Sequence, residues 1–485
     1  MSKRTILAIL ICTLWLAAMG WLVYRENSTP VLRTTETPDD RLAGIEDTWM
    51  GLFTSEDDRV GHVHLRRSPI TVDGLEGVEM ELEAAMTLNL LGRNTSLELG
   101  GTVWRPYDEK RADFNFNVSS AEYNLQVGGQ VANGRLSGEV TSAAEKFPLD
   151  MEVDDNVLFA NFGTAMTFPK LAVGDEFKMT SFDPMTLRPT PAKVRCIDEQ
   201  VIRLAGRMMA TQILEVDSNG FKAKVWVDGS GEVVQAETPL GLTMRLIEPQ
   251  DVREAITGEA DELLQLTSVQ PSGKKVFRGA RRAVLKIAEG PDRELPSDDV
   301  QRFADGMLEI VTPSAPAPGG EVTADEEFLA SDPFVQSSHP KIQEQSATIV
   351  GDESDPWQKA LAIYDWVYTK VEKEPVVSIP SALEVLANLR GDCNEHTVLY
   401  TALARAAGLP TRIAIGLVWS DTLNGYYYHA WPEVRINDTW FWLDPTLGQP
   451  MADATHIKIL NGGIERWTQL LPYIGQLEIE VVEID

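Results

Sequence analysis

Three side chains near the C-terminal end of the chain are of the types that make an activated nucleophile. They are the thiol of Cys393, the imidazole of His429 and the carboxylate of Asp444. A thiol attacks a carbonyl carbon once a base has taken its proton, and a carboxylate that orients the imidazole makes the ring an effective base. The three residue types therefore predict attack on an amide or ester carbonyl through a covalent intermediate.

Cys393 is predicted to open a helix. Gly391 supplies a tight turn, Asp392 is a suitable N-cap, and the helix runs to about Ala407, where Gly408 ends it. Backbone N–H groups and the positive end of the helix dipole would face the sulfur, so we expect a lowered thiol pKa. The alternative is a buried structural cysteine, and the position of the residue alone does not decide between the two.

The imidazole and the carboxylate fall on one predicted β-hairpin. Residues 426–443 predict two antiparallel strands with a two-residue turn at 437–438. With that turn Trp431 would face Asp444, and His429 would be the diagonal neighbour of Asp444 on the same face. Diagonal neighbours lie about 7–8 Å apart, within reach of long side chains. The hairpin therefore supports the pairing of this imidazole with this carboxylate.

Three short motifs resemble those of the transglutaminase-like superfamily. They are Gly391–His396 (GDCNEH), His429–Val434 (HAWPEV) and Trp442–Thr446 (WLDPT), in the order cysteine, histidine, aspartate. The resemblance covers about residues 325–470 and is nearest to the bacterial, membrane-tethered branch. The tail Asp453–Ile457 (DATHI) is also similar to that branch.

The resemblance implies a papain-like α+β core in which Cys393 is the nucleophile, His429 the general base and Asp444 the residue that orients it. It implies a thioester intermediate formed from a peptide or protein substrate, with the backbone N–H of Cys393 as one oxyanion donor. Water as the acceptor would make the enzyme a protease or amidase, and an amine would make it a cross-linker. Both remain open. We expect no cofactor and no metal. No EF-hand-like loop occurs, so calcium dependence is not indicated.

Other residues near the motifs have two readings each. Tyr427 and Trp431 could shape a substrate site, or they could be core residues. His396, one helical turn after Cys393, could line the site or pack behind it. We expect His456 to be structural, and Cys196 to be a small buried residue rather than half of a disulfide.

Composition limits the partners. The chain of 485 residues carries 73 Asp+Glu against 43 Lys+Arg, a formal net charge of -30. Such a field repels nucleic acid and anionic lipid headgroups, so we expect no nucleic-acid role. The sequence does not indicate an oligomeric state.

The N-terminus predicts a membrane anchor. Lys3 and Arg4 precede Thr5–Tyr24, a run without formal charge. About twenty apolar residues span a bilayer as a helix, and a cleaved signal peptide is the alternative. We expect a single-pass protein with a cytoplasmic N-terminus and an extracytoplasmic remainder, in the periplasm or at the cell surface.

Patterns along the chain predict five segments. Apolar residues at every second position after residue 46 predict an antiparallel β region, a large curved sheet or partial barrel. Pro/Gly-rich sequence at 313–320 predicts a linker. The predicted segments are an anchor at 1–25, a flexible tether at 26–45, the β domain at 46–250, a small mixed or β region with the linker at 251–324, and the transglutaminase-like domain at 325–485.

Two alternative functions compete with the enzyme assignment. The C-terminal domain could be a catalytically silent module that binds a peptide or a fragment of the cell envelope. Alternatively, the chain could be a structural envelope protein in which the β half is the working part. The presence of Cys393, His429 and Asp444 together favours the enzyme, because a binding-only module does not need them.

Overall fold

The computed structural model describes most of the chain after residue 45. The predicted anchor at 1–25 and tether at 26–45 lie outside the described residues. Among the described residues, no helix is both long enough and apolar enough to cross a membrane. The structure describes residues 46–485 except 56, 91–92, 108–110, 121–123, 144, 154–167, 169, 184–187, 219–220, 238–240, 254–267, 290–293, 375–380, 464–465, 467–468, 471–472 and 474–476.

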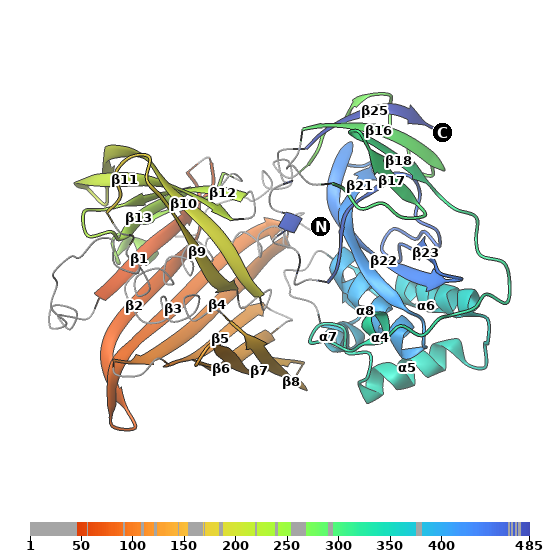
Figure 1. Cartoon of the computed structure of the whole chain (residues 1–485), viewed down its shortest axis with the longest axis horizontal. Coiled ribbons are helices and arrows are strands. Elements are labelled where there is room, and N and C mark those ends of the chain that lie inside the picture. The colour runs from red at the N-terminus through yellow and green to blue at the C-terminus, as the bar shows by residue number, and fades with distance from the viewer. Residues whose placement is uncertain are drawn as a thin grey trace. The chain divides into compact units, whose positions relative to one another are not determined.

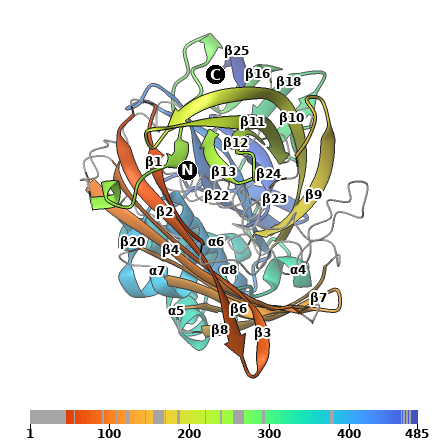
Figure 2. The same ribbon diagram turned by 90° about the vertical axis from the view of Figure 1, so that its left-hand side faces the viewer.

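The N-terminal unit is built on one 14-stranded antiparallel sheet, in the order β8-β7-β6-β5-β4-β3-β2-β1-β14-β13-β12-β11-β10-β9. Pairing of β1 with β14 joins the first strand to the last, and Figures 1 and 2 show the strands bending into a curved surface. The strands are β1 (Glu46–Phe53), β2 (Arg59–Val72), β3 (Leu75–Leu90), β4 (Arg93–Pro106), β5 (Arg111–Ser120), β6 (Asn124–Ala132), β7 (Arg135–Ser142), β8 (Glu145–Glu152), β9 (Glu176–Asp183), β10 (Arg188–Leu204), β11 (Arg207–Ser218), β12 (Phe221–Val227), β13 (Val233–Glu237) and β14 (Thr243–Leu246).

Alternating side chains explain these strands. On β3, every second residue from Met80 to Met86 is buried, while Glu81, Glu83 and Ala85 between them are more exposed. Period-two alternation places one face of a strand against a core and the other in water. The antiparallel β fold predicted for this region is confirmed.

The C-terminal unit is α+β, and its described part begins at residue 268. It contains a five-stranded sheet (β15-β25-β16-β18-β17), a parallel pair (β19-β20) and a four-stranded antiparallel sheet (β23-β22-β21-β24). The strands are β15 (Ser272–Gly273), β16 (Arg282–Glu289), β17 (Gln301–Ala304), β18 (Met307–Val311), β19 (Glu372–Lys373), β20 (Arg390–Gly391), β21 (Thr411–Ser420), β22 (Gly425–Ile436), β23 (Thr439–Trp442), β24 (His456–Asn461) and β25 (Glu478–Ile484). The helices are α4 (Glu326–Leu329), α5 (Pro340–Val350), α6 (Pro356–Lys370), α7 (Ala382–Asn388) and α8 (Cys393–Ala406), with a short 3-10 turn η2 (Asp251–Arg253) in the N-terminal unit.

Residues 272–311 share a sheet with the end of the chain. We expected 251–324 to form a separate small region. Instead β16 pairs with β25 on one side and with β18 on the other, so these strands belong to the same compact unit as the helices. A pairing between segments so far apart in the sequence leaves no local signal.

Helix α6 begins at a capping signal. Asp355 caps α6 by accepting a hydrogen bond from the backbone N–H of Gln358 at 3.0 Å, and Pro356 occupies the first turn. Figure 1 shows α5 to α8 gathered beside the four-stranded sheet, and α8 packs on β21 and β22.

The hairpin of β22 and β23 has the predicted register. Ile436 pairs with Thr439 and Glu433 with Trp442, so the turn contains two residues. The two turn residues, at 437–438, have φ values of 52° and 58°, as expected when both central positions of a tight hairpin turn are left-handed. β22, which carries His429, packs on α8, and the Thr397 hydroxyl of α8 donates to the carbonyl oxygen of Ala430 at 3.0 Å.

Candidate active site

Cys393 is the first residue of α8, and the helix start that carries it is firmly capped. The Asp392 side chain accepts from the backbone N–H of Asn394 at 3.1 Å. The Glu395 carboxylate accepts from the backbone N–H of Asp392 at 2.7 Å, which completes a capping box. The predicted N-cap is confirmed, and the cap fixes the backbone on both sides of the thiol.

Gly391 is needed for this cap. Its φ is 153°, and a Cβ on this residue would lie 2.2 Å from the Cβ of Glu395. A larger residue would therefore push the capping carboxylate out of place. Gly391 also lies on β20, where its carbonyl accepts from the backbone N–H of Glu374 at 3.0 Å. The turn before Cys393 is thus held from two directions.

The Cys393 thiol is buried, with 5% of the residue exposed. Burial raises the pKa of the thiol to about 12, and the nearby charge of Asp392 adds to the rise. A hydrogen bond to the backbone of Ala430 opposes it. The lowered pKa expected from the helix N-terminus is therefore wrong for this buried thiol, because desolvation outweighs the favourable position. The contact with Ala430 places the sulfur beside the strand residue that follows His429.

The ring of His429 is oriented by Asp444. Nε2 of His429 lies 2.9 Å from Oδ2 of Asp444, and both side chains are buried. A carboxylate only accepts, so Nε2 carries the proton and Nδ1 is left as the basic nitrogen. Burial lowers the pKa of His429 to about 4, although the Asp444 charge opposes this shift. The imidazole is therefore neutral at neutral pH.

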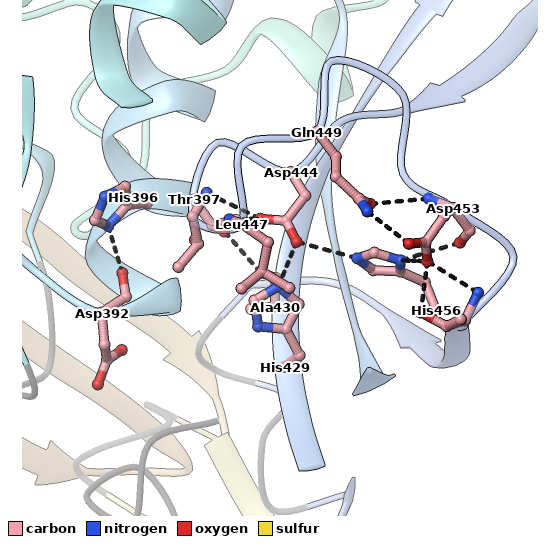
Figure 3. A network of polar contacts seen from close by, with 12 residues as sticks. Asp392, His396, Thr397, His429, Ala430, Asp444, Leu447, Gln449, Asp453 and His456 are labelled. Carbon is pink, nitrogen blue, oxygen red and sulfur yellow. Dashed lines mark hydrogen bonds and ion pairs between the residues drawn. The ribbon is translucent and has the colours of Figure 1, made fainter. Parts of the chain in front are cut away.

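Each carboxylate oxygen of Asp444 accepts two hydrogen bonds. Its Oδ1 accepts from the backbone N–H groups of Thr446 at 2.9 Å and Leu447 at 2.8 Å. Its Oδ2 accepts from His429 and also from Nε2 of His456, at 3.1 Å (Figure 3). Burial favours the neutral acid, yet the two imidazoles hold the pKa of Asp444 well below its usual range. The carboxylate is therefore charged and cannot rotate without losing several hydrogen bonds.

The contact between His429 and Asp444 forms slightly differently from the prediction. The β22–β23 ladder ends at Trp442, and Asp444 pairs instead with Gln449 through two backbone hydrogen bonds of 2.8 and 2.9 Å. Asp444 is thus the first residue of a turn rather than a strand residue opposite Trp431. Sequence reasoning found this partner of His429 but missed the second imidazole, that of His456. The DATHI similarity was the signal that could have directed attention to it.

The predicted substrate-contacting residues have different surroundings. Trp431 is fully buried, with its ring 6.1 Å from the His429 ring and 5.1 Å from the His456 ring, so it is a core residue beneath the two imidazoles. Tyr427 is half-buried and its hydroxyl donates to the Leu423 carbonyl at 3.3 Å.

His396 is also fully buried. Its Nδ1 lies 2.7 Å from the carbonyl oxygen of Asp392, so Nδ1 is the protonated nitrogen (Figure 3). Burial lowers the pKa of His396 and keeps the ring neutral. Its observed contact supports the helix start that carries the thiol.

His429, Asp444 and His456 are the one group of potential metal ligands found among the described residues, with ligand atoms within 4.8 Å of one another. The hydrogen bonds from both imidazoles to Asp444 account for this clustering. We therefore do not assign the cluster to a metal ion.

A second buried charge network supports the same sheet. Glu433 is fully buried on β22 and accepts from Nζ of Lys458 at 2.7 Å and from Nε of Arg412 at 2.5 Å. Lys458 also pairs with Asp298. Two cations and two carboxylates neutralise one another here, as buried charges require.

Comparison with known proteins identifies part of the C-terminal unit. Residues 343–445 match the model of the transglutaminase-like superfamily. An uncharacterized protein of Haemophilus influenzae is 28% identical over 140 residues, which are 28% of this chain and 35% of that protein. The chain therefore matches about a third of the length of this relative.

Two solved structures share similarity at low identity. A "putative cysteine protease" from Cytophaga hutchinsonii is 16% identical, covers 45% of this chain and 89% of its own, and gives a TM-score of 0.29. A beta-barrel-like protein from Brucella abortus is 11% identical, covers 43% of this chain and 96% of its own, and also gives 0.29. Both TM-scores are too low to establish a shared fold.

Proposed function

We propose that the C-terminal unit, whose residues 343–445 match the model of the transglutaminase-like superfamily, is a thiol enzyme that attacks peptide or protein amide bonds. Cys393 is the nucleophile, His429 the general base and Asp444 the residue that orients His429. The observation that carries the proposal is the 2.9 Å hydrogen bond from His429 to Asp444, on a strand whose next residue, Ala430, contacts the Cys393 sulfur.

In the proposed acylation step, Nδ1 of His429 takes the proton of the Cys393 thiol while the sulfur bonds to the substrate carbonyl carbon. The carbonyl electrons move to its oxygen, and the backbone N–H of Cys393 is one donor to that oxyanion. When the tetrahedral adduct collapses, the C–N bond breaks and His429 gives its proton to the leaving amine. The product on the enzyme is a thioester.

In the proposed deacylation step, the acceptor gives a proton to Nδ1 of His429 and bonds to the thioester carbon. The C–S bond then breaks, and the Cys393 sulfur recovers its proton. Water as the acceptor releases an acid, and a primary amine releases a new amide. The buried, neutral state of both side chains suits a general-base mechanism, in which the thiol ionises as it attacks, because no preformed thiolate is required.

A catalytically silent module that binds a peptide or an envelope fragment is the second candidate. The observation that favours it is the burial of Cys393, which raises the pKa of its thiol to about 12. A thiol that never ionises would serve only as a packing group.

We also propose that the protein acts outside the cytoplasm, tethered through Thr5–Tyr24. The support is the uncharged apolar sequence of that run, preceded by Lys3 and Arg4.

Trapping of the acyl-enzyme tests the proposed reaction. The full-length chain is mixed with 4-nitrophenyl acetate, and the acetyl group is located by peptide mass spectrometry. We expect acetylation of Cys393 within seconds, while Cys196, which is also free and buried, serves as the internal control. Added methylamine then distinguishes the acceptors: N-methylacetamide identifies an acyltransferase and acetate a hydrolase. Acetylation of Cys393 no faster than of Cys196 would favour the silent module.

A further inference from the structure

His456 has acceptors at both of its ring nitrogens. Nε2 lies 3.1 Å from Oδ2 of Asp444. Nδ1 lies 3.1 Å from the backbone carbonyl oxygen of Asp453 and 3.3 Å from its carboxylate oxygen Oδ1. The ring is fully buried, so water cannot take the place of either partner.

This arrangement fixes the charge of the ring. A neutral imidazole has one N–H and one lone pair, and the lone pair would then face an oxygen that also has only lone pairs. Two N–H groups satisfy both sides, which requires an imidazolium. The same conclusion follows from electrostatics: burial lowers the pKa of His456, but Asp444 and Asp453 more than reverse this and raise it.

Asp453 is itself firmly held. Its Oδ2 accepts from the backbone N–H of Gly279 at 2.8 Å and from the side chain of Gln449 at 2.6 Å, and it pairs with Arg278 at 3.2 Å. Burial favours the neutral acid, yet His456 and Arg278 hold the pKa of Asp453 far below its usual range.

Asp444, Gln449, Asp453 and His456 form a closed network of hydrogen bonds and ion pairs. Gln449 is bonded through its backbone to Asp444 and through its side chain to Asp453, and His456 joins the two carboxylates directly (Figure 3). The second carboxylate therefore anchors His456 against the first.

We propose that His456 is a positioning residue, an imidazolium that holds Asp444 in place and offsets its negative charge, so that His429 remains a neutral base. The catalytic consequence rests on the proposed function above. The charge state of His456 does not, because it follows from the hydrogen-bonding geometry and can be measured in an inactive protein.

The expected effect on His429 is large because the two rings are close, with centroids 5.8 Å apart. A unit charge at that distance, at an effective dielectric constant of about 20, changes the pKa of its neighbour by about two units. Within the described part of the chain, the charged or titratable groups that bear on His429 are Asp444 and His456. Those that bear on Asp444 from other elements are His396 on α8, Lys373 on β19 and Tyr364 on α6.

Nitrogen NMR of the imidazoles tests the charge directly. The full-length chain has six histidines, so each ring can be assigned with single variants. We expect both nitrogens of His456 to be protonated at about pH 7, above the usual pKa of a histidine, and His429 to show one protonated and one bare nitrogen. A bare nitrogen on His456 at about pH 7 would overturn the proposal.

His456→Gln tests the effect on His429. Glutamine can donate an N–H to Asp444 but carries no charge, so the His429 pKa should rise by about one to two units. The acid limb of the kcat/KM profile should move to higher pH by the same amount. Thr455→Val is the matched control, because it removes the hydrogen bond of Thr455 to Asp453 at 2.5 Å without changing a charge.

The outcomes separate this proposal from the proposed function. An unchanged His429 pKa in His456→Gln, with only a loss of stability, would mean that His456 is merely structural and would overturn the proposal. A shifted His429 pKa in a protein that shows no acyl transfer would support the role of His456 and contradict the enzyme assignment.

Discussion

Cys393→Ser is expected to lower kcat/KM for acyl transfer by at least about 10³-fold, as losses of a catalytic nucleophile do in other enzymes. A serine hydroxyl is far less acidic than a thiol. The base beside it is weak, since burial lowers the pKa of His429 to about 4. The measurement is steady-state hydrolysis of an activated ester, with urea unfolding to show that the variant is folded.

Cys196→Ser is the matched control for that experiment. Cys196 is also free and buried, but it lies on β10 in the N-terminal unit. Burial raises the pKa of its thiol, and no imidazole is among the groups that bear on it. The control should keep full activity. Equal activity of Cys393→Ser and Cys196→Ser would exclude Cys393 as the nucleophile.

Asp444→Asn is expected to reduce kcat/KM by about 10³ to 10⁴-fold. An amide can donate to His429 as well as accept from it, so the ring loses the bond that keeps Nδ1 free to act as the base. The substitution also leaves the His456 charge with one buried partner fewer, which should lower the free energy of unfolding by about 3 kcal/mol or more. Kinetics and urea unfolding of the same preparation give both values.

Glu433→Gln is the control for Asp444→Asn. Glu433 is another fully buried carboxylate and lies on β22, but its partners are Lys458 and Arg412 rather than histidines. Its replacement should also destabilise the fold, while activity per folded molecule stays within a few-fold of the wild type. Comparable losses of activity in the two variants would mean that Asp444 acts through stability alone.

Local sequence signals were enough to place two of the three proposed catalytic residues on their elements. Gly391 and Asp392 marked the start of α8, because a helix cap and a tight turn are determined by adjacent residues in the sequence. The two-residue turn at 437–438 fixed the register of β22 and β23, and with it the neighbourhood of His429.

The features of the site that the sequence did not predict depend on contacts between distant segments. His456 reaches Asp444 because β24 pairs with β21, and Asp453 is held by Arg278 and Gly279 from a segment far earlier in the chain. No window of sequence contains these partners together. The membership of residues 272–311 in the C-terminal unit was missed for the same reason, since it rests on pairing with β25.

The pKa of the Cys393 thiol was mispredicted because the burial that raises it depends on tertiary packing. The position of Cys393 at a helix start is visible in the sequence and favours the thiolate. The packing of α8 on β22, which removes the thiol from water, is not visible there. For the same reason the sequence could not distinguish core from substrate site for Trp431, which the structure places beneath His429 and His456.

The rate of Cys393 alkylation by iodoacetamide as a function of pH, in the wild type and in His429→Ala, tests the cooperation of these two residues most directly. With His429 as the base, the wild-type rate should be nearly constant above about pH 5, because the pKa of His429 is about 4. The variant should react more slowly, and its rate should rise about tenfold per pH unit with the thiolate fraction. If the two profiles coincide and both rise toward the thiol pKa, His429 does not activate Cys393 and the proposed enzyme is contradicted.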